Sequence, residues 1–526
     1  MSAPPSQRRV LFLIADTGAG HRSAANAILH AMQLLAESPE LSSPRHPIIT
    51  DSGTTMRAGR PRENGGWDAL IVDAFMECGR FPLRNGVFLY GPAIKHSPRL
   101  YGRFFHLTNT AARYEAATRY MKPFLYQGLA HLLLDTRPDV IVSVHPLLNH
   151  ITLQILRDLN IKMPFITVIT DLVSIHCSWI APGVTACAVP TEAAYQLAIT
   201  AGVPTKRVHL LGMPIDPKFA QPPAMGQPAL REQLGLDPAR PTILLVGGGE
   251  GAIGLGEAVM AIGHSDLDAR MIVVTGRNRQ LRAQLELARA HFRVPAQVLG
   301  FVQNMPDLMH AADVIVTKAG PGTINEAMAC GLPIILTGAI PGQEEGNIDF
   351  VLDNEISVLA RSPALVVGAL RELLTPDSLL LGRLRERVRA LSRPEASLDI
   401  ARLVLKHLPP AGTPSLWAKV SHHNLPRRYR ARPGRPMAAG RRGPRALGAR
   451  LLVRARGRGL GQNRQLLRAL RFRVDGRPRR IPGLADLKGA RALFLRGAHL
   501  GSIQLRRPGS GGRRYDAGSD LGRRGG

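Results

Sequence analysis

The first residues suited to acid–base chemistry lie where a predicted strand gives way to a helix. The buried-strand pattern at residues 10–15 runs into the turn DTGAGH, residues 16–21. Gly18 and Gly20 allow backbone N–H groups to approach an anionic donor, which the N-terminus of the following helix also favours. Because histidine titrates near neutral pH, His21 is predicted to be a general base or a contact of a donor phosphate. The alternative is a histidine that only caps a tight turn.

Two glycine-rich turns in the second half also follow predicted strands. The run GGGEG at residues 247–251 suits close approach to a diphosphate, with a structural turn as the alternative; no Gly-Lys-Ser/Thr follows, so it is not a Walker loop. The run KAGPGTINEA at residues 318–327 opens a helix whose first N–H groups can hold donor phosphates. Glu326 lies one turn into that helix, where a carboxylate can accept from both ribose hydroxyls. The alternative is a glutamate that faces solvent.

A fourth motif, PGQEEGN at residues 341–347, follows the next predicted strand. Gln, Glu and Asn side chains at this density suit hydrogen bonding to sugar hydroxyls. The alternative is a plain surface loop.

Alternating strands and helices must position these turns. Strands are predicted at residues 69–72, 140–144, 165–170, 186–189, 242–247, 271–275, 297–299, 313–317 and 333–336, with helices between most of them. This alternation is typical of parallel, doubly wound sheets, so the predicted fold class is α/β with two Rossmann-like domains that bind a nucleotide between them. The predicted domains are residues 8–214 and 241–408, joined by a linker region at 215–240. Residues 364–407 are expected to close the second domain.

The charge of the chain is concentrated at one end. The 526 residues carry a formal net charge of +29, which by itself suggests nucleic-acid binding. Residues 411–526 hold 29 Lys+Arg and 4 Asp+Glu, whereas residues 1–410 hold 39 and 35. The charge therefore belongs to an Arg/Gly/Pro-rich tail at 411–526, and no specific nucleic-acid partner is expected. Three interpretations of the tail stay open: a disordered basic segment that meets anionic lipid, a frameshifted translation, or a small basic domain.

Residues 81–105, FPLRNGVFLYGPAIKHSPRLYGRFF, interleave aromatic and basic side chains. Such a segment suits a membrane surface, where aromatic rings enter the interface and cations meet anionic head groups. The candidate contacts are Phe81, Phe88, Tyr90, Arg99, Phe104 and Phe105; the alternative is a loop and helix packed on the first domain. No apolar run of about 20 residues is present, so no transmembrane helix is expected. Four widely spaced cysteines predict neither a disulfide framework nor a zinc site.

The motifs together resemble one known family. GAGHRSAANAI, VSVHP, TDL, GGGEG, TGRN, the run from GFVQN to LPIIL and PGQEEGN resemble the monogalactosyldiacylglycerol synthase and processive diacylglycerol glucosyltransferase family, over roughly residues 8–405. More distantly they resemble the N-acetylglucosaminyltransferase that completes peptidoglycan lipid intermediates. The sequence departs from the family pattern after TDL, where Cys177 stands at a position usually held by proline.

The resemblance implies a GT-B fold, inversion at the anomeric carbon, and no bound metal or cofactor. It implies that Glu326 holds the ribose and that the backbone near Phe301 and Val302 holds the uracil. Further donor contacts are implied for Gly249, Glu250, Gly320, Pro321, Gly322 and Thr323, with Arg277 and Asn278 nearby, and hexose contacts for Gln343, Glu344 and Asn347. His21 is implied as the catalytic base or acceptor-side helper, with His145 and Asp171 as further candidates.

The predicted activity is transfer of galactose or glucose from a UDP-sugar to the 3-hydroxyl of 1,2-diacylglycerol. The protein is expected to bind anionic lipid peripherally, on the cytoplasmic face of a membrane. Inversion needs one displacement at C1, so a base must take the proton of the attacking hydroxyl. The alternatives are a UDP-N-acetylglucosaminyltransferase acting on a polyprenyl-linked lipid, a UDP-sugar epimerase, and a non-catalytic nucleotide-sugar binder.

Overall fold

Two parallel sheets form the framework of the protein. The computed structural model describes residues 8–16, 19–37, 67–84, 97–247, 254–410, 413–418, 420 and 424–426. Within these residues lie two six-stranded sheets, ordered β2-β1-β3-β4-β5-β6 and β12-β11-β10-β7-β8-β9. The strand pairs are parallel throughout both sheets. The α/β fold class predicted from the alternating pattern is therefore confirmed.

The strands are short and the inner ones are buried, as expected for parallel sheets covered on both faces, whereas the edge strands β2, β9 and β12 are partly exposed. The first sheet comprises β1 (Arg8–Ile14), β2 (Trp67–Asp73), β3 (Val140–Ser143), β4 (Phe165–Val168), β5 (Ala186–Val189) and β6 (Val208–Leu210). The second comprises β7 (Thr242–Val246), β8 (Arg270–Val274), β9 (Ala296–Leu299), β10 (Val314–Thr317), β11 (Ile334–Leu336) and β12 (Ser357–Leu359).

Helices connect successive strands and cover the sheets. In the first half these are α1 (Ala19–Glu37), α2 (Ala74–Cys78), α4 (Pro98–Thr108), α5 (Ala111–Thr136), α6 (Asn149–Asp158) and α7 (Glu192–Thr200), with short 3₁₀ helices η2 (Pro146–Leu148), η3 (Cys177–Trp179), η4 (Thr205–Arg207) and η5 (Pro217–Ala220). In the second half they are α8 (Gln227–Gln233), α9 (Leu255–Gly263), α10 (Arg279–Ala288), η6 (Arg289–His291), α11 (Met305–Ala311), α12 (Pro321–Ala329), α13 (Glu345–Asp353), α14 (Pro363–Leu373), α15 (Leu379–Leu391) and α16 (Ala396–Lys406).

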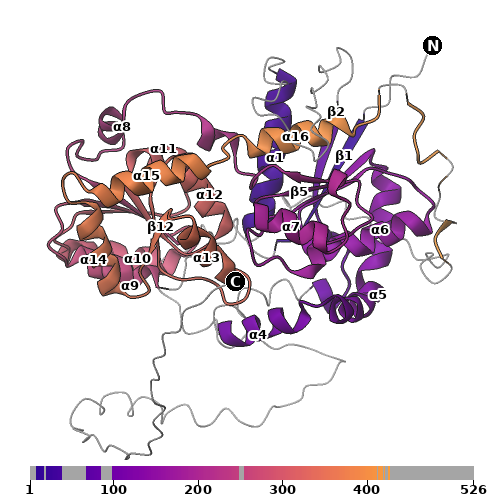
Figure 1. The fold of residues 1–526 in the computed structure, drawn as a ribbon, viewed down its shortest axis with the longest axis horizontal. Coiled ribbons are helices and arrows are strands. Elements are labelled where there is room, and N and C mark those ends of the chain that lie inside the picture. Colours follow the sequence, from indigo (N-terminus) through magenta and orange to yellow (C-terminus); the bar gives the residue numbers. More distant parts are fainter. Residues whose placement is uncertain are drawn as a thin grey trace, which may run out of the picture. The chain divides into compact units, whose positions relative to one another are not determined.

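The last helix, α16, belongs to the first sheet rather than the second. It packs beside α1, as Figure 1 also shows. Its buried residues Ile400 and Val404 share one apolar cluster with Val10 and Phe12 of β1. The expectation that residues 364–407 close the second domain was therefore wrong for α16, because an amphipathic helix reveals which face is apolar but not which sheet covers it.

The segment after α16 also contributes to the first domain, which corrects the predicted start of the tail at residue 411. Trp417 is 1% exposed and packs with Leu425 in the cluster that covers the α5–α6 side of the first sheet. Its indole Nε1 donates to the backbone oxygen of Pro138, 2.7 Å away. The few apolar residues of this short segment show no sustained period, so the sequence pattern did not predict this contact.

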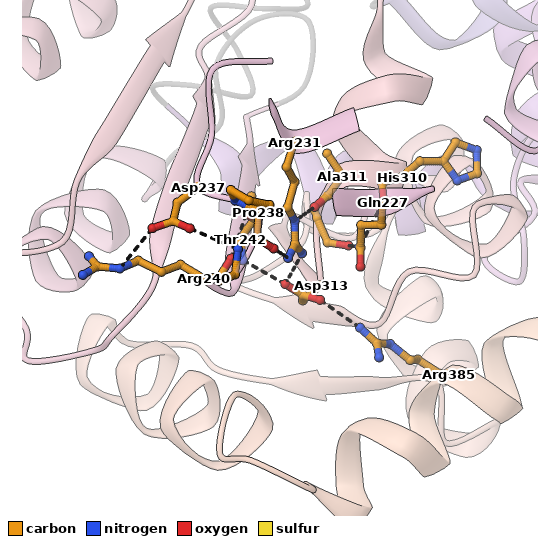
Figure 2. Close-up of polar contacts among 12 residues, drawn as sticks. Gln227, Arg231, Asp237, Pro238, Arg240, Thr242, His310, Ala311, Asp313 and Arg385 are labelled. Atoms are coloured by element: carbon orange, nitrogen blue, oxygen red, sulfur yellow. Dashed lines mark hydrogen bonds and ion pairs between the residues drawn. The ribbon is translucent and has the colours of Figure 1, made fainter. Parts of the chain in front are cut away.

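The predicted linker region contacts the second domain through a polar cluster around Asp313 (Figure 2). Arg231 of α8 forms an ion pair with Asp313 at 2.5 Å and donates through Nε to the Ala311 oxygen at 2.8 Å. Arg385 of α15 reaches the other carboxylate oxygen, and the N–H of Thr242 also donates to Asp313. This partly buried cluster lies at the amino ends of β7 and β10, the edge opposite the carboxyl ends of these strands, and we assign it a structural role.

Candidate active site

The three predicted catalytic side chains come together at the carboxyl ends of strands in the first sheet. The His21 and His145 rings meet edge to face with their centroids 4.8 Å apart. The indole of Trp179 lies 6.1 Å from the His21 ring, and its Nε1 donates to Asp171 Oδ2 over 2.6 Å. Trp179 therefore bridges His21 and Asp171.

Local structure fixes the position of His21 at the start of α1. Asp16, at the end of β1, donates its N–H to the Asp73 carboxylate and accepts a bidentate contact from Arg22. These bonds join the residue that follows β1 to β2 and to the first turn of α1. The His21 ring itself is hydrogen-bonded to the Val144 backbone, and its Nδ1 lies 3.4 Å from the Thr170 hydroxyl.

Burial governs the protonation of these groups. Burial lowers the pKa of His21 to about 4, opposed by its bond to Val144 and by the Asp16 charge. Burial, then the nearby His21, also lowers the pKa of His145 well below its usual value. Burial raises the pKa of Asp171 to about 6, against the bonds from Trp179 and Gln343. Both histidines are therefore neutral at pH 7, and such displaced pKa values cluster at functional sites.

The loop after β11 contacts this cluster from the second half of the chain. The Gln343 side chain hydrogen-bonds Asp171, and its Oε1 accepts from the Tyr101 hydroxyl of α4 over 3.1 Å. The Gly346 N–H donates to Ser174 Oγ at 2.9 Å, and a Cβ at Gly346 would lie 2.5 Å from that oxygen. The predicted hexose loop is thus in direct contact with the predicted catalytic residues.

The motif GPGT forms the start of α12, as predicted. Gly320 is the N-cap residue and Pro321 the first helical residue, followed by Gly322 and Thr323. A Cβ on Gly322 would meet no atom within 4 Å, so space is open beside the first turn. The first N–H groups of a helix lack intrahelical partners and favour anions.

Glu326 lies one turn further along α12. Burial, and then the nearby Asp216 charge, raise its pKa to about 7. Asp216 caps η5 and bonds His30 Nδ1 of α1 at 2.9 Å. Near pH 7 this carboxylate is therefore only partly ionised. Hydrogen bonds from two hydroxyl groups would stabilise its ionised form, and the two ribose hydroxyls of the predicted contact can donate them.

The predicted uracil site is flanked by an exposed ring. Phe301 is 65% exposed, and the Arg277 guanidinium stacks over it at 5.6 Å. Val302 is half-buried beside it. Asn278 instead caps α10, with its Oδ1 accepting from the Leu281 N–H.

Two residues predicted to face the hexose also have partners within the protein. Glu344 is 5% exposed, accepts from Lys318 Nζ and also accepts from the Ile340 N–H. Asn347 is buried in α13 and donates to the Ala319 oxygen at 2.8 Å. The motif is therefore partly a helix start and not a plain polar loop, since α13 begins at Glu345.

The predicted membrane segment divides between two directions. Phe81 is 77% exposed, and Leu100 and Phe104 form an exposed apolar stripe on α4 beside Arg99. Phe105 points elsewhere: it is half-buried, its ring lies 5.1 Å from that of His176, and it covers Gly342. The prediction that Phe105 faces lipid was therefore wrong, because consecutive helical residues point about 100° apart, and this turn carries Phe105 away from the exposed stripe and toward His176.

Some predicted site residues lie outside the described residues. These are Gly18, Gly249, Glu250, Phe88 and Tyr90. Gly20 is exposed in the first turn of α1, next to His21, with no atom within 4 Å of a Cβ built on it.

Residues that sequence reasoning missed include Trp179, Tyr101 and Lys318. Trp179 follows the unusual HCS run, and a tryptophan beside chemistry-bearing motifs was a usable signal. Tyr101 was indistinguishable from its aromatic neighbours because only the contact with Gln343 sets it apart. Lys318 stands directly before the glycine turn, where a cation near phosphate-binding amides could have been singled out.

Comparisons with known proteins show which family the chain resembles. The family model for monogalactosyldiacylglycerol (MGDG) synthase matches residues 62–215, and that for the glycosyltransferase family 28 C-terminal domain matches residues 242–346. The chain is 35% identical over 411 residues to probable monogalactosyldiacylglycerol synthase 2, chloroplastic, of Oryza sativa subsp. japonica, covering 76% of this chain and 80% of the relative. It is 33% identical over 404 residues to monogalactosyldiacylglycerol synthase 3, chloroplastic, of Arabidopsis thaliana, covering 75% and 80%. Among solved structures, Acinetobacter baumannii MurG aligns with a TM-score of 0.48 at 16% identity, covering 76% of this chain and 99% of MurG.

Two Rossmann-like sheets with this site define a glycosyltransferase of the GT-B class. The extent and identity of the match to its relatives place it more narrowly. The chain belongs to the monogalactosyldiacylglycerol synthase family.

Proposed function

We propose that this enzyme transfers a hexose from a UDP-sugar to the 3-hydroxyl of 1,2-diacylglycerol with inversion at C1, and that galactose is the preferred hexose. The observation that carries the proposal is the bond between Gln343 and Asp171, which joins the donor-side loop to the catalytic cluster. Family membership supports the donor and the acceptor, since the relatives are named for this product.

His21 serves as the base in this mechanism. Its ring is neutral at pH 7, and one nitrogen is engaged with the Val144 backbone. The other nitrogen takes the proton as the acceptor oxygen attacks C1 and the C1–O bond to the β-phosphate breaks. His145 and Trp179 hold the ring in a desolvated setting. A positioned base of this kind contributes about 10²–10⁴-fold to a rate.

The donor is proposed to lie along the second sheet. Uracil stacks near Phe301, the ribose hydroxyls donate to Glu326, and the diphosphate meets the first turn of α12. This assignment is supported by the exposed ring, the near-neutral carboxylate and the open space beside Gly322. We also propose donor contacts for Gly18, Gly249 and Glu250. These residues lie outside the described ranges, so the proposal rests on their sequence motifs.

The acceptor reaches the site from a membrane surface, which we place at the cytoplasmic face. The exposed stripe of Leu100, Phe104 and Leu107 on α4, with Arg99 and Arg103 beside it, is supported as the docking surface by its mixture of apolar and cationic groups. Tyr120 of α5 adds a further exposed ring. Among the residues that the structure describes, no helix is long and apolar enough to cross a bilayer.

One experiment tests donor, acceptor and anomeric outcome together. The protein is incubated with diacylglycerol vesicles and separately with UDP-galactose, UDP-glucose and UDP-N-acetylglucosamine, and the lipid product is identified by mass and by NMR of its anomeric proton. We expect β-linked monohexosyldiacylglycerol, fastest with UDP-galactose. Release of UDP with no glycolipid, or interconversion of the free UDP-sugars, would contradict the proposal.

Transfer is also proposed to need no metal ion. The α12 N-terminus and nearby cations supply the positive charge for UDP departure. We expect the rate to be unchanged after treatment with a chelator. A rate that falls with chelator and returns with added Mg²⁺ or Mn²⁺ would contradict this.

A further inference from the structure

An ion pair between Lys318 and Glu344 lies beside the start of α12. Lys318 directly follows β10, and Glu344 directly precedes α13. Lys318 Nζ donates to Glu344 Oε1, while the Ile340 N–H donates to Oε2 over 2.9 Å. The Glu344 side chain is 6% exposed and that of Lys318 is 27% exposed. The carboxylate is thus held inside the protein from two sides, whereas the ammonium keeps an accessible side.

The ammonium lies over the N-cap of α12. A Cβ built on Gly320 would be 3.1 Å from Lys318 Nζ and 3.8 Å from Glu344 Oε1. The next glycine, Gly322, has open space beside it. A group that occupies this space on the first-turn N–H groups therefore comes within reach of the ammonium, and any side chain at Gly320 would intrude between them.

Stability alone is a weak reason for such a pair. A partly buried ion pair loses hydration on folding, and replacing it by apolar residues is often neutral or stabilising. The distant cluster around Asp313 already holds the second domain with three polar partners. The position of Lys318 at the diphosphate end of α12 gives the pair a chemical use instead.

We infer that Lys318 is a catalytic cation that contacts the β-phosphate of the donor, and that Glu344 is a positioning residue that holds its ammonium over the α12 N-terminus. The inference rests on the function proposed above. When C1 bonds to the acceptor oxygen, the bonding pair of C1–O moves to the β-phosphate oxygen, and the acceptor proton moves to His21. Lys318 neutralises the charge that appears on that phosphate, alongside the helix N–H groups.

The two partners then respond in opposite directions, which a purely structural pair would not do. Lys318→Met keeps the length of the side chain and removes its charge, so UDP affinity is expected to fall by at least about tenfold while uridine affinity is unchanged. Glu344→Gln frees the ammonium from a competing anion, so UDP binds at least as tightly as to the wild type. The same change lets the ammonium move, so kcat falls by about tenfold without a rise in the KM for UDP-sugar.

Calorimetry of UDP and uridine binding to the full chain, with steady-state transfer assays, provides the readout. The double variant K318M/E344Q removes both charges and guards against misfolding caused by a lone buried carboxylate; it is expected to bind UDP as weakly as K318M. Arg371→Met breaks an exposed ion pair with Asp266 in the same domain and serves as the matched control, with no effect expected.

Wild-type protein that binds no UDP would overturn the proposed function itself. Wild-type protein that binds UDP and transfers hexose, while K318M and the double variant match it in both, would overturn only the role of Lys318. Equal losses of UDP and uridine affinity in K318M and E344Q, in step with lower melting temperatures, would assign the pair a structural role and also overturn the inference.

Discussion

The two sheets present different chemistry at the ends of their strands. At the first sheet, His21, His145 and Asp171 are buried together, and their pKa values are displaced in the direction that favours their neutral forms. At the second sheet, the principal features are helix N–H groups and the exposed Phe301. A desolvated region suits proton transfer, whereas an open region of backbone donors suits recognition of a charged nucleotide. The division predicts that loss of a side chain from the buried cluster of the first region lowers the rate and spares nucleotide binding, whereas loss of a nucleotide contact in the second region weakens binding.

The sharpest test of this division is His21→Ala. Loss of the proposed base is expected to lower kcat by about 10²–10⁴-fold, while UDP affinity measured by calorimetry stays within about twofold. Near-normal transfer by the variant would remove His21 from the base role. A parallel loss of UDP affinity would show that the two regions do not divide their work in this way.

The core of the first sheet also includes residues from the segment after α16. The variant Trp417→Ala tests how much this segment stabilises the first domain. Removing this indole from the first domain is expected to cost about 3–5 kcal/mol of unfolding free energy, as for other buried large-to-small changes. Denaturant unfolding of the variant measures the loss. Leu416→Ala, at the exposed neighbouring position, is the matched control and should be nearly neutral.

Truncation extends the same test to the whole end of the chain. A protein ending at Arg435, where the compact unit ends, should melt like the full chain. A protein ending at Pro410 lacks Trp417 and Leu425 and should melt markedly lower. Equal melting temperatures for the two truncations would contradict the contribution of these residues to the core.

A titration of Glu326 probes the binding side. Burial raises its pKa to about 7, and the ionised form is the one that accepts from both ribose hydroxyls. Affinity should therefore fall as the pH drops through that value, by about tenfold between about pH 8 and pH 6. Uridine is the probe because it has no phosphate to titrate. Glu326→Gln should bind uridine weakly and with a flat pH profile; a profile like that of the wild type would exclude Glu326 as the titrating group.

The smallest effect is expected at the membrane surface. The double variant Leu100→Gln with Phe104→Gln should bind anionic vesicles up to about tenfold more weakly, because its apolar area no longer enters the interface. Transfer to a diacylglycerol dispersed in detergent should be nearly unchanged. Leu287→Gln, at an apolar residue of α10 that is more exposed than Leu100 or Phe104, is the control and should not alter vesicle binding. Equal vesicle binding by all three proteins would contradict the docking surface.

Sequence pattern predicted most of the framework and part of the site. The strands and the helix starts were within reach because glycine turns follow apolar runs, as at Gly20 and Gly320. The packing of α16 on the first sheet could not be predicted, because periodicity shows that a helix has an apolar face but not which element covers that face. The same limit applies to Glu344 and Phe105, whose types suggested ligand or lipid contact. Only three-dimensional neighbours, Lys318 for one and His176 for the other, show where they point.

The packing of α16 and Trp417 on the first sheet has a consequence for biosynthesis. Domains generally fold as the chain leaves the ribosome, beginning with the N-terminal one. Here the sheet that is synthesised first cannot bury its full apolar surface until residue 425 has been made. The sheet that is synthesised second is covered by α14 and α15, which are made before α16. The two sheets are therefore completed in the reverse of the order in which they are synthesised, because the N-terminal half keeps an uncovered apolar face until α16 and residues 417–425 have been made.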